Sequence, residues 1–485
     1  MNAATQMVPH AADYLRILPE LVLSIFGIII MLLDPALDPR RGQKVLGTVA
    51  FLGALAALVS TILQAQSPGL AFWNMVQVDS FSIFFHFLVT TITAVVILTS
   101  YDYMQVQQIR AGEYYGLILF GAVGMCLMSS AVELVLVFIA LEISSISTYI
   151  LAGFRRRAAI SSEAAVKYFL LGSFATAFFL YGIALMFGAT GSTSLGPISQ
   201  ALRAQPIPVL AYLALALMFV GLGFKVAAAP FHIWTPDVYE GAPSPVVGFM
   251  STAPKAAVFA VLLRIMFQIN APGRLWLIWV VAALSMTLGN IGALVQDNVK
   301  RLLAYSSIAH AGYLLVAFAA LPRSGIPAAM FYAAAYAAMN VGAFAVVSHF
   351  ASAGERYVTL EDYSGLGERS PILAATLTLF LLSLIGIPVT GGFFAKFYVF
   401  TAALQANLVG LVIIGVLNSA VGAYYYLRII VAMYMREARE QQPLSPIPAG
   451  LAAALTVNAL ATIYLGVLPG RVLDYASRSV TELLH

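Results

Sequence analysis

Six basic residues lie inside apolar segments of this sequence, where a charged group is costly to place. They are Lys167, Lys225, Lys255, Arg264, Lys396 and Arg428. A lysine can gain and lose a proton, whereas an arginine keeps its proton at any ordinary pH. The four lysines could therefore carry protons through an apolar phase, while the two arginines can only anchor or tune them.

Glu142 and His310 could exchange protons with these lysines. Glu142 is deep in the apolar run 132–154, and His310 is about ten residues into the run 301–321. Burial disfavours the charged form of a lysine and a nearby carboxylate favours it, so a pair whose coupling changes can take up and release a proton. Imidazole suits the same task because it titrates near neutral pH. The expected relay residues are Glu142, Lys167, Lys225, Lys255, His310 and Lys396.

Each position also has a purely structural interpretation. A lysine–glutamate pair could be a static ion pair that joins two helices. Lys167 lies near the start of its run, with Glu163 four residues before it. It could therefore form an ion pair with Glu163 at the surface, or extend its ammonium group to the membrane–water interface. His310 and His86 could be packing histidines. Glu133 precedes Glu142 by nine residues, which places it on the opposite helix face, and its role stays open.

The composition places these residues in a membrane protein. The chain has 485 residues, of which 25 are basic and 21 acidic, so 9% are charged, whereas soluble domains average about 25%. Apolar residues make up 61% and the mean hydropathy is +0.91. These values exclude a soluble enzyme, a secreted domain and a disordered chain. They indicate a polytopic membrane protein.

Motifs for redox or hydrolytic chemistry are missing from the sequence. Cys126 is the single cysteine, whereas an iron–sulfur cluster needs about four thiolates. The sequence also lacks a phosphate-binding loop, a dinucleotide fingerprint and a zinc-binding HExxH. The net charge of +4 is too small and dispersed to suggest nucleic acid. We expect no cofactor and no metal in this chain, so energy for uphill transport must come from elsewhere.

We expect an all-α fold of about fourteen transmembrane helices. A span needs about 20 mainly apolar residues in helical form, because lipid offers no partner for free backbone groups. The runs that meet this requirement are 13–33, 45–65, 78–101, 114–130, 132–154, 163–188, 209–235, 244–269, 274–296, 301–321, 325–350, 371–400, 407–435 and 448–470.

The basic residues of the loops predict the orientation of the chain. With the N-terminus outside, the inner loops hold Arg40, Arg41, Lys44, Arg110, Arg155, Arg156, Arg157, Lys300, Arg301, Arg356, Arg369, Arg436 and Arg439. The outer segments then hold Arg16, Arg203, Arg274, Arg323, Arg471 and Arg478. Because the first set has thirteen members and the second six, both termini are expected outside.

Two of the runs contain helix-breaking residues. Pro230 follows Lys225 by five residues, and Pro388 with three neighbouring glycines precedes Lys396. Paired interrupted helices indicate internal repeats around an ion site at the midplane, and a separation of five helices indicates that the repeats are inverted. His232, just beyond Pro230, could cap freed carbonyls or join the relay. The expected division is a three-helix segment (1–110), two five-helix repeats (111–270 and 271–436) and a C-terminal helix with a tail (437–485).

Several long stretches resemble one family. They are GFKVAAAPFHIWTPDVYEGAPSPVVGFMSTAPKAAVFAVLLR at 223–264, NVKRLLAYSSIAHAGYLL at 298–315, GIPVTGGFFAKFYVF at 386–400 and IALEISSISTYILAGF at 139–154. They are similar to the core of the antiporter-like subunits of respiratory complex I, the proton-translocating NADH:quinone oxidoreductase. The similarity is greatest to subunit N, and the long 223–264 block makes it highly specific.

The resemblance implies a role for each relay residue. Glu142 would modulate Lys225 on the first broken helix, and Lys255 would connect two half-channels. Lys167 would match the sixth-helix lysine, His310 the tenth-helix histidine and Lys396 the lysine of the second broken helix, near the exit. In the related subunit M a glutamate usually replaces this last lysine, so Lys396 favours subunit N or L.

The resemblance also implies a function, redox-driven proton translocation by a translocase subunit that performs no redox chemistry alone. NADH, FMN, iron–sulfur clusters and quinone would belong to partner subunits. The partners would be the L-, M-, K- and J-like subunits, in the inner (plasma) membrane of a bacterium, with both termini on the periplasmic side. The alternatives are a subunit of a multi-subunit sodium/proton antiporter and a structural spacer with static lysines.

Overall fold

The computed structural model describes residues 9–37, 42–109, 112–204, 207–269, 274–320, 322–351, 353–437 and 445–484. The described chain is almost entirely helical, as predicted, apart from one short β-hairpin. Four basic residues counted for the orientation lie outside the described residues: Arg40, Arg41, Arg110 and Arg439.

The first half of the chain contains nine helices and the hairpin, within the described residues. These elements are α1 (Ala11–Arg16), α2 (Leu18–Leu33), α3 (Gly42–Gln64), β1 (Gly69–Ala71), β2 (Val76–Val78), α4 (Ser80–Val106), α5 (Gly112–Ser130), α6 (Leu134–Ala152), α7 (Ala159–Thr190), α8 (Leu195–Ala204) and α9 (Val209–Lys225). The strands pair antiparallel, with Leu70 opposite Gln77. Short 3₁₀ turns, such as Asp34–Ala36, complete the connections.

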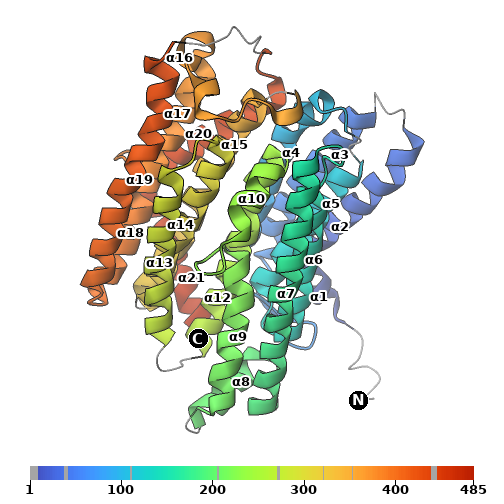
Figure 1. Cartoon of the computed structure of the whole chain (residues 1–485). Helices are drawn as coiled ribbons and strands as arrows, with labels where there is room; N and C mark the ends of the chain where they lie inside the picture. Colours follow the sequence, from blue (N-terminus) through green and yellow to red (C-terminus); the bar gives the residue numbers. More distant parts are fainter. Residues whose placement is uncertain are drawn as a thin grey trace.

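The second half continues with helices of very different lengths. They are α10 (Trp234–Gly241), α11 (Ser244–Met250), α12 (Ala253–Gln268), α13 (Arg274–Leu294), α14 (Val299–Ala319), α15 (Pro322–Phe350), α16 (Leu366–Arg369), α17 (Pro371–Ile385), α18 (Gly391–Gln405), α19 (Val409–Met435), α20 (Ala449–Val467) and α21 (Pro469–Leu484). Figure 1 shows the two halves side by side, with α9 of the first half and α10 and α12 of the second half at the boundary between them.

Twelve helical segments of the described chain are long and apolar enough to cross a membrane, with α11 and α12 counted together as one segment. Two shorter apolar helices, α9 and α17, are the first parts of the two runs predicted to be interrupted. Large apolar side chains are exposed on the outer helices, such as Leu32 (72% exposed) and Phe174 (65% exposed). Helices α11, α12, α14 and α15 are instead buried over almost their whole apolar length. The exact number of spans stays a prediction.

Both predicted helix breaks are present. The first lies between α9 and α10, where Ser285 Oγ accepts a hydrogen bond of 2.8 Å from the Ala229 N–H. The second lies between α17 and α18, where Ser383 Oγ accepts one of 3.1 Å from the Gly392 N–H. A serine hydroxyl from a packed segment thus satisfies a backbone donor that the broken helix leaves free. The turn between α11 and α12 is a further break that the sequence did not predict.

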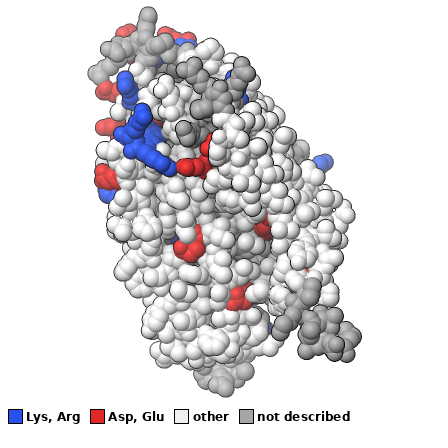
Figure 2. Space-filling view, turned by 90° about the vertical axis from the view of Figure 1, so that its right-hand side faces the viewer, with Lys and Arg blue, Asp and Glu red and all other residues white. Residues whose placement is uncertain are grey.

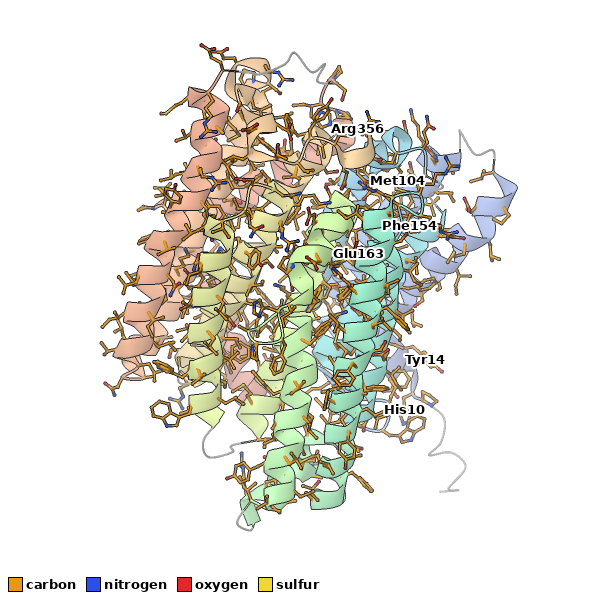
Figure 3. The ribbon with its side chains drawn as sticks, in the orientation of Figure 1. His10, Tyr14, Met104, Phe154, Glu163 and Arg356 are labelled. Atoms are coloured by element: carbon orange, nitrogen blue, oxygen red, sulfur yellow. The ribbon has the colours of Figure 1, made fainter. Side chains whose placement is uncertain are left out.

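The two ends of the bundle differ in charge. His10 and Tyr14 lie near the lower end in Figure 3, whereas Phe154 and Arg356 lie near the upper end. On the face shown in Figure 2, most atoms belong to uncharged residues, and the Lys and Arg side chains gather near the upper end. Helices α1, α8 and α21 lie towards the lower end in Figure 1. The upper end is therefore the one that the loop charges predict to be inside.

A buried carboxylate ties several elements together at the upper end. Glu355, just after α15, forms ion pairs with Lys300 Nζ at 2.6 Å and Arg155 at 2.9 Å. Its other oxygen accepts hydrogen bonds from the Tyr103 hydroxyl (2.9 Å) and the Ser244 N–H (2.7 Å). Burial would raise the pKa of the Glu355 carboxyl, but the two cations and these donors hold it below its ordinary value.

We predict that Glu355→Gln lowers the free energy of unfolding by about 3–5 kcal/mol, because it leaves two buried cations without their counter-charge. The stabilisation by the native carboxylate is complete above the ordinary glutamate pKa of about 4.3 and is lost as the pH falls through the lower folded pKa. Thermal unfolding in detergent at several pH values measures both effects. The exposed Glu368→Gln is the control, and equal melting of both variants would contradict the prediction.

Candidate functional site

Lys225 ends α9 at the first helix break and is buried, with 4% of its surface exposed. Its ammonium donates hydrogen bonds to Ser145 Oγ (2.9 Å), Tyr168 OH (3.1 Å) and Thr148 Oγ1 (3.3 Å). It also lies 5.2 Å from the centre of the Tyr149 ring, within the range of a cation–π contact. Neutral oxygens and aromatic rings therefore surround this cation.

Glu142 occupies the same helix, α6, as two of these hydroxyls. At about 100° per residue, Glu142, Ser145 and Thr148 lie within about 120° of the helix circumference. Among the described residues, no carboxylate lies within 4.0 Å of the Lys225 ammonium, and the buried Glu142 Oε1 accepts no hydrogen bond. The interaction between Glu142 and Lys225 is thus a longer-range one rather than a direct ion pair.

Glu133 has a different function, which the sequence left open. It is the N-cap of α6, and its Oε2 accepts a hydrogen bond of 2.7 Å from the Leu136 N–H. This bond satisfies one of the free donors in the first turn of the helix. A polar residue directly before an apolar run is the signal that could have identified this cap.

Lys255 and His310 line one small cavity of about 10 Å³, which is borderline for a single water molecule. The Lys255 ammonium donates to Ser307 Oγ at 2.6 Å and to the Ser307 carbonyl at 3.0 Å. His310 Nδ1 lies 2.7 Å from the Tyr332 hydroxyl, and Nε2 lies 3.3 Å from the Tyr426 hydroxyl. The structure therefore brings these two predicted residues together, with hydroxyl groups between α12, α14, α15 and α19.

Lys396 lies in the same region, on α18, and its side chain reaches across the second helix break to the end of α17. Its ammonium donates to the carbonyls of Ile385 (2.8 Å) and Leu384 (3.1 Å), at the C-terminus of α17, and to Ser419 Oγ (2.8 Å). A cation is favourable there because the last carbonyls of a helix carry partial negative charge. The ammonium also lies 4.8 Å from the centre of the Tyr313 ring, which contacts His310 edge-on.

The predicted relay residues form two groups in the structure, one around Lys225 and one that contains Lys255, His310 and Lys396. Within the described chain, no series of hydrogen bonds joins them. Tyr168 stacks on Trp234 with ring centres 4.4 Å apart, and Trp234 contacts Tyr239 at 6.2 Å. The buried Tyr239 hydroxyl forms no hydrogen bond within 3.5 Å of its oxygen among the described residues, although it interacts with Ser307 at longer range. This aromatic series leads from the first group towards the second.

Lys167 lies at the edge of this arrangement. Its side chain is 41% exposed, and its ammonium pairs with Asp237 (2.7 Å) and Glu163 (2.8 Å). Asp237 also pairs with Arg301 at 2.6 Å, which in turn pairs with Glu240 at 2.8 Å. The predicted pairing with Glu163 is present, so Lys167 is part of a charged surface network. Its neighbour along α7, Tyr168, is the residue that contacts Lys225.

The two arginines are anchored, as expected for residues that keep their charge. Arg264 pairs with Asp79 at 2.8 Å, and Arg428 pairs with Asp297 at 2.7 Å. His232, near the first break, is half-buried, and its Nδ1 makes no hydrogen bond within the described residues. The arginines thus join segments of the bundle, and the suggested role of His232 as a cap of freed carbonyls stays a prediction.

The sequence did not predict the hydroxyl groups that hold the lysines. The clearest examples are Ser145, Thr148, Tyr168, Ser307 and Ser419. Serines and threonines are common in transmembrane helices, where many bond only to the carbonyl one turn earlier. Their spacing from Glu142 could have identified the two on α6, but the others come from helices distant in sequence.

Comparison with known proteins shows that the chain is similar to the members of one family. The family described as NADH:quinone oxidoreductase/Mrp antiporter, TM, matches residues 131–422. The chain is 66% identical over 481 residues to NADH-quinone oxidoreductase subunit N 2 of Koribacter versatilis, and the match covers 98% of both chains.

Solved structures have the same fold. A chain of respiratory complex I from Thermus thermophilus is 40% identical, with a TM-score of 0.81, and the match covers 95% of this chain and 99% of that one. A chain of the Mrp complex from Dietzia is 21% identical with a TM-score of 0.81, covering 96% and 97%. At that identity the second similarity concerns the fold alone.

The two glutamates of this region should respond differently to substitution. Glu133→Ala should lower stability by about 1 kcal/mol through loss of the N-cap. Glu142→Gln should leave stability unchanged or raise it, because the half-buried side chain has a buried Oε1 that no described residue hydrogen-bonds. Thermal unfolding in detergent compares them, and an equal loss of stability in both would contradict these assignments.

Proposed function

Because the chain belongs to the family of NADH-quinone oxidoreductase subunit N, we propose that its relay residues form the path along which it translocates protons. The path consists of Glu142, Lys167, Lys225, Lys255, His310 and Lys396. The chain is a membrane-arm subunit of a translocase driven by electron transfer from NADH to quinone. It performs no redox chemistry by itself, since the redox cofactors lie in other subunits, where we place FMN and the iron–sulfur clusters.

One observation carries this proposal. Among the described residues, Lys225, Lys255 and Lys396 have no carboxylate within 4.0 Å, and hydroxyl and carbonyl oxygens hold their ammonium groups. A static ion pair would require a carboxylate partner at contact distance. Hydroxyl groups can accept a hydrogen bond from a charged lysine and donate one to a neutral lysine. Such surroundings support a residue that changes its protonation state.

The geometry suggests the order of the steps. The charge of Glu142 stabilises a protonated Lys225, and a change in that charge or in its hydration releases the proton towards Tyr239 and Lys255. Lys255 and His310 share a cavity, so a proton can pass between them through one water molecule. His310 then leads through its tyrosine neighbours to Lys396. Lys167 acts at the edge, where Asp237 can adjust its charge.

The surroundings of the chain follow from the same proposal. We place both termini in the periplasm, so that protons enter at the upper end of Figure 1 and leave at the lower end. The host membrane is the inner membrane of a bacterium, and the partners are the L-, M-, K- and J-like subunits. The proposed organisation has fourteen spans, with inverted repeats at 111–270 and 271–436 between the terminal segments 1–110 and 437–485. The two helix breaks support these repeats.

The alternative function, a subunit of a multi-subunit sodium/proton antiporter, is less well supported. The matched family includes such antiporters, but the Mrp chain is only 21% identical, whereas subunit N relatives reach 66%. The antiporter function requires sodium-dependent exchange without any electron donor. Proton translocation that appears only during NADH:quinone turnover would exclude it.

We predict that Lys225→Ala lowers coupled proton translocation by about tenfold or more, since a positioned proton-transfer group contributes at least this factor. Lys225→Arg should fail as well, because arginine keeps the charge but does not release a proton. Proton translocation per electron in the intact assembly is the measurement, and the exposed Lys44→Ala is the control. Full activity of Lys225→Arg would favour static pairing instead.

The orientation can be tested with introduced cysteines, because the native Cys126 is buried. Gly196→Cys, in α8 at the lower end, has open space around the new side chain, and Arg156, near the upper end, is exposed. In intact cells a membrane-impermeant maleimide should label Gly196→Cys and leave Arg156→Cys unlabelled. The reverse pattern would overturn the proposed orientation.

A further inference from the structure

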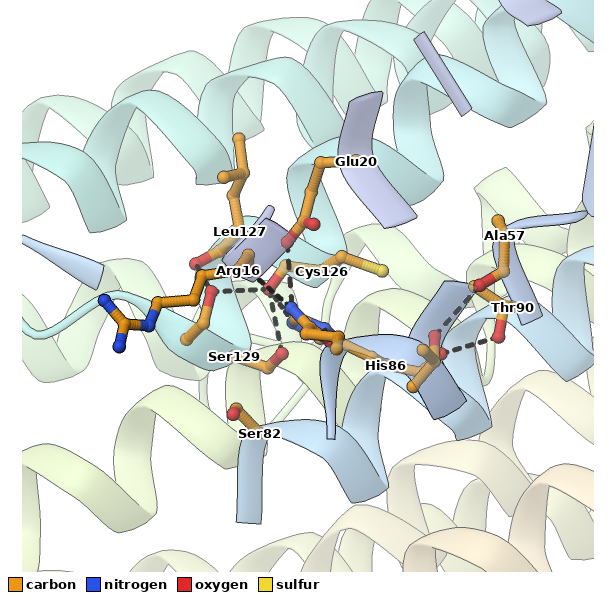
Figure 4. A network of polar contacts seen from close by, with 12 residues as sticks. Arg16, Glu20, Ala57, Ser82, His86, Thr90, Cys126, Leu127 and Ser129 are labelled. Carbon is orange, nitrogen blue, oxygen red and sulfur yellow. Dashed lines mark hydrogen bonds and ion pairs between the residues drawn. The ribbon is translucent and has the colours of Figure 1, made fainter. Parts of the chain in front are cut away.

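A second buried titratable pair lies outside the relay, in the N-terminal helices. Glu20 is in the first turn of α2, and His86 is in the second turn of α4. Both are buried, with 3% and 0% of their surface exposed, and Figure 4 shows them pointing towards each other. Their closest atoms, Glu20 Oε1 and His86 Nε2, are 3.5 Å apart. The proposed relay uses neither residue.

Both nitrogens of the His86 ring face hydrogen-bond acceptors. Nε2 lies 2.9 Å from the main-chain carbonyl of Cys126, which can only accept (Figure 4). Nδ1 lies 2.9 Å from Gln64 Oε1. The amide nitrogen of Gln64 donates to the Arg16 carbonyl, which fixes the amide orientation and leaves its oxygen facing the ring. Two acceptors require two N–H donors, so this environment matches the imidazolium form of His86.

Glu20 supplies the counter-charge that a buried imidazolium needs. Neither of its oxygens accepts a hydrogen bond from the described residues, although both are buried. Among the described residues, His86 is the basic side chain that lies within 4.0 Å of the Glu20 carboxyl group. The place of Glu20 in the first turn of α2 also favours a negative charge, because the free N–H groups of a helix N-terminus carry partial positive charge.

The other charged groups around the pair already form ion pairs of their own, although Asp79 Oδ2 and Arg264 Nη1 form no hydrogen bond with the described residues. Asp79, the N-cap of α4, pairs with Arg264 at 2.8 Å, so their charges offset each other. The Arg16 side chain turns away to Asp13 and to the Leu70 carbonyl of the hairpin. The thiol of Cys126 is buried beside the pair. None of these groups replaces Glu20 or His86 as the partner of the other.

We propose that Glu20 and His86 form a proton-binding dyad, separate from the lysines, which holds one exchangeable proton as a carboxylate–imidazolium pair. Release of the proton from Nε2 or Nδ1 leaves a neutral His86 beside the Glu20 carboxylate, and uptake restores the imidazolium. Gln64 links the ring to the Arg16 carbonyl, and the Arg16 side chain donates to the exposed Pro68 carbonyl. The dyad thus holds its proton near the lower end of the bundle. This inference rests on the contacts of Glu20 and His86 and does not depend on the proposed lysine relay.

Infrared spectroscopy of the intact assembly tests the charge state of the dyad. Near neutral pH, His86→Gln should produce a new carboxylic-acid C=O band, because Glu20 loses its cation and takes up a proton. The band should be absent from the double variant with Glu20→Gln. His349→Gln, which removes an imidazole near the other end, should not produce it. If Glu20→Gln alone removes such a band from the native protein, the pair is neutral and the proposal is wrong.

Infrared spectroscopy with isotope-labelled histidine provides a second measurement. It does not need the His86 variant, so it remains possible if that variant assembles poorly. The native assembly should have an imidazolium band that Glu20→Gln removes, since the ring loses its counter-charge. That band should also disappear as the pH is raised and return when it is lowered, which tests exchange. A band that Glu20→Gln leaves in place, or that does not respond to pH, would overturn the dyad.

Discussion

The cost of placing a charge in an apolar phase governs this structure. Each buried cation must find oxygen atoms within the chain, because lipid supplies none. Lys396 takes carbonyls that a broken helix leaves free, and Lys225 lies at the end of a helix, beside hydroxyls of two others. The helix breaks are therefore part of the same solution as the lysines. They supply polar backbone atoms at a depth where continuous helices would have none.

Buried cations fall into two classes that look alike in the sequence. Arg264 and Lys300 have carboxylate partners at contact distance, and such pairs hold segments in place. Among the described residues, Lys225, Lys255 and Lys396 donate only to neutral oxygens, which is the basis of their proposed change of protonation state. Lys300 shows why the sequence does not separate the two classes. Its place just before an apolar run predicted a loop residue, whereas the structure buries it beside Glu355. The distinction depends on the partner and not on the depth.

Much of the fold could be predicted, because apolar runs and helix-breaking residues act locally. The spans, the two breaks and the positions of Lys255 and Lys396 all follow from the order of residues along the chain. The hairpin at 69–78, α8, the turn before Lys255 and the final helix α21 were missed. Helix α21 is amphipathic and packs against α4 and α15. It contains no continuous apolar run, so a search for such runs does not detect it.

The sequence by itself determined that this is a multi-spanning membrane protein of a recognisable family, because composition and long matching stretches need no partner in space. It also predicted which residues form the proton relay, and that assignment stays a prediction. Only the tertiary structure decided that Glu142 and Lys225 are not in direct contact, that Lys255 and His310 share a cavity, and that Glu133 caps a helix. The reason is physical: a side chain's charge is set by the atoms that surround it, and helices distant in sequence supply most of them.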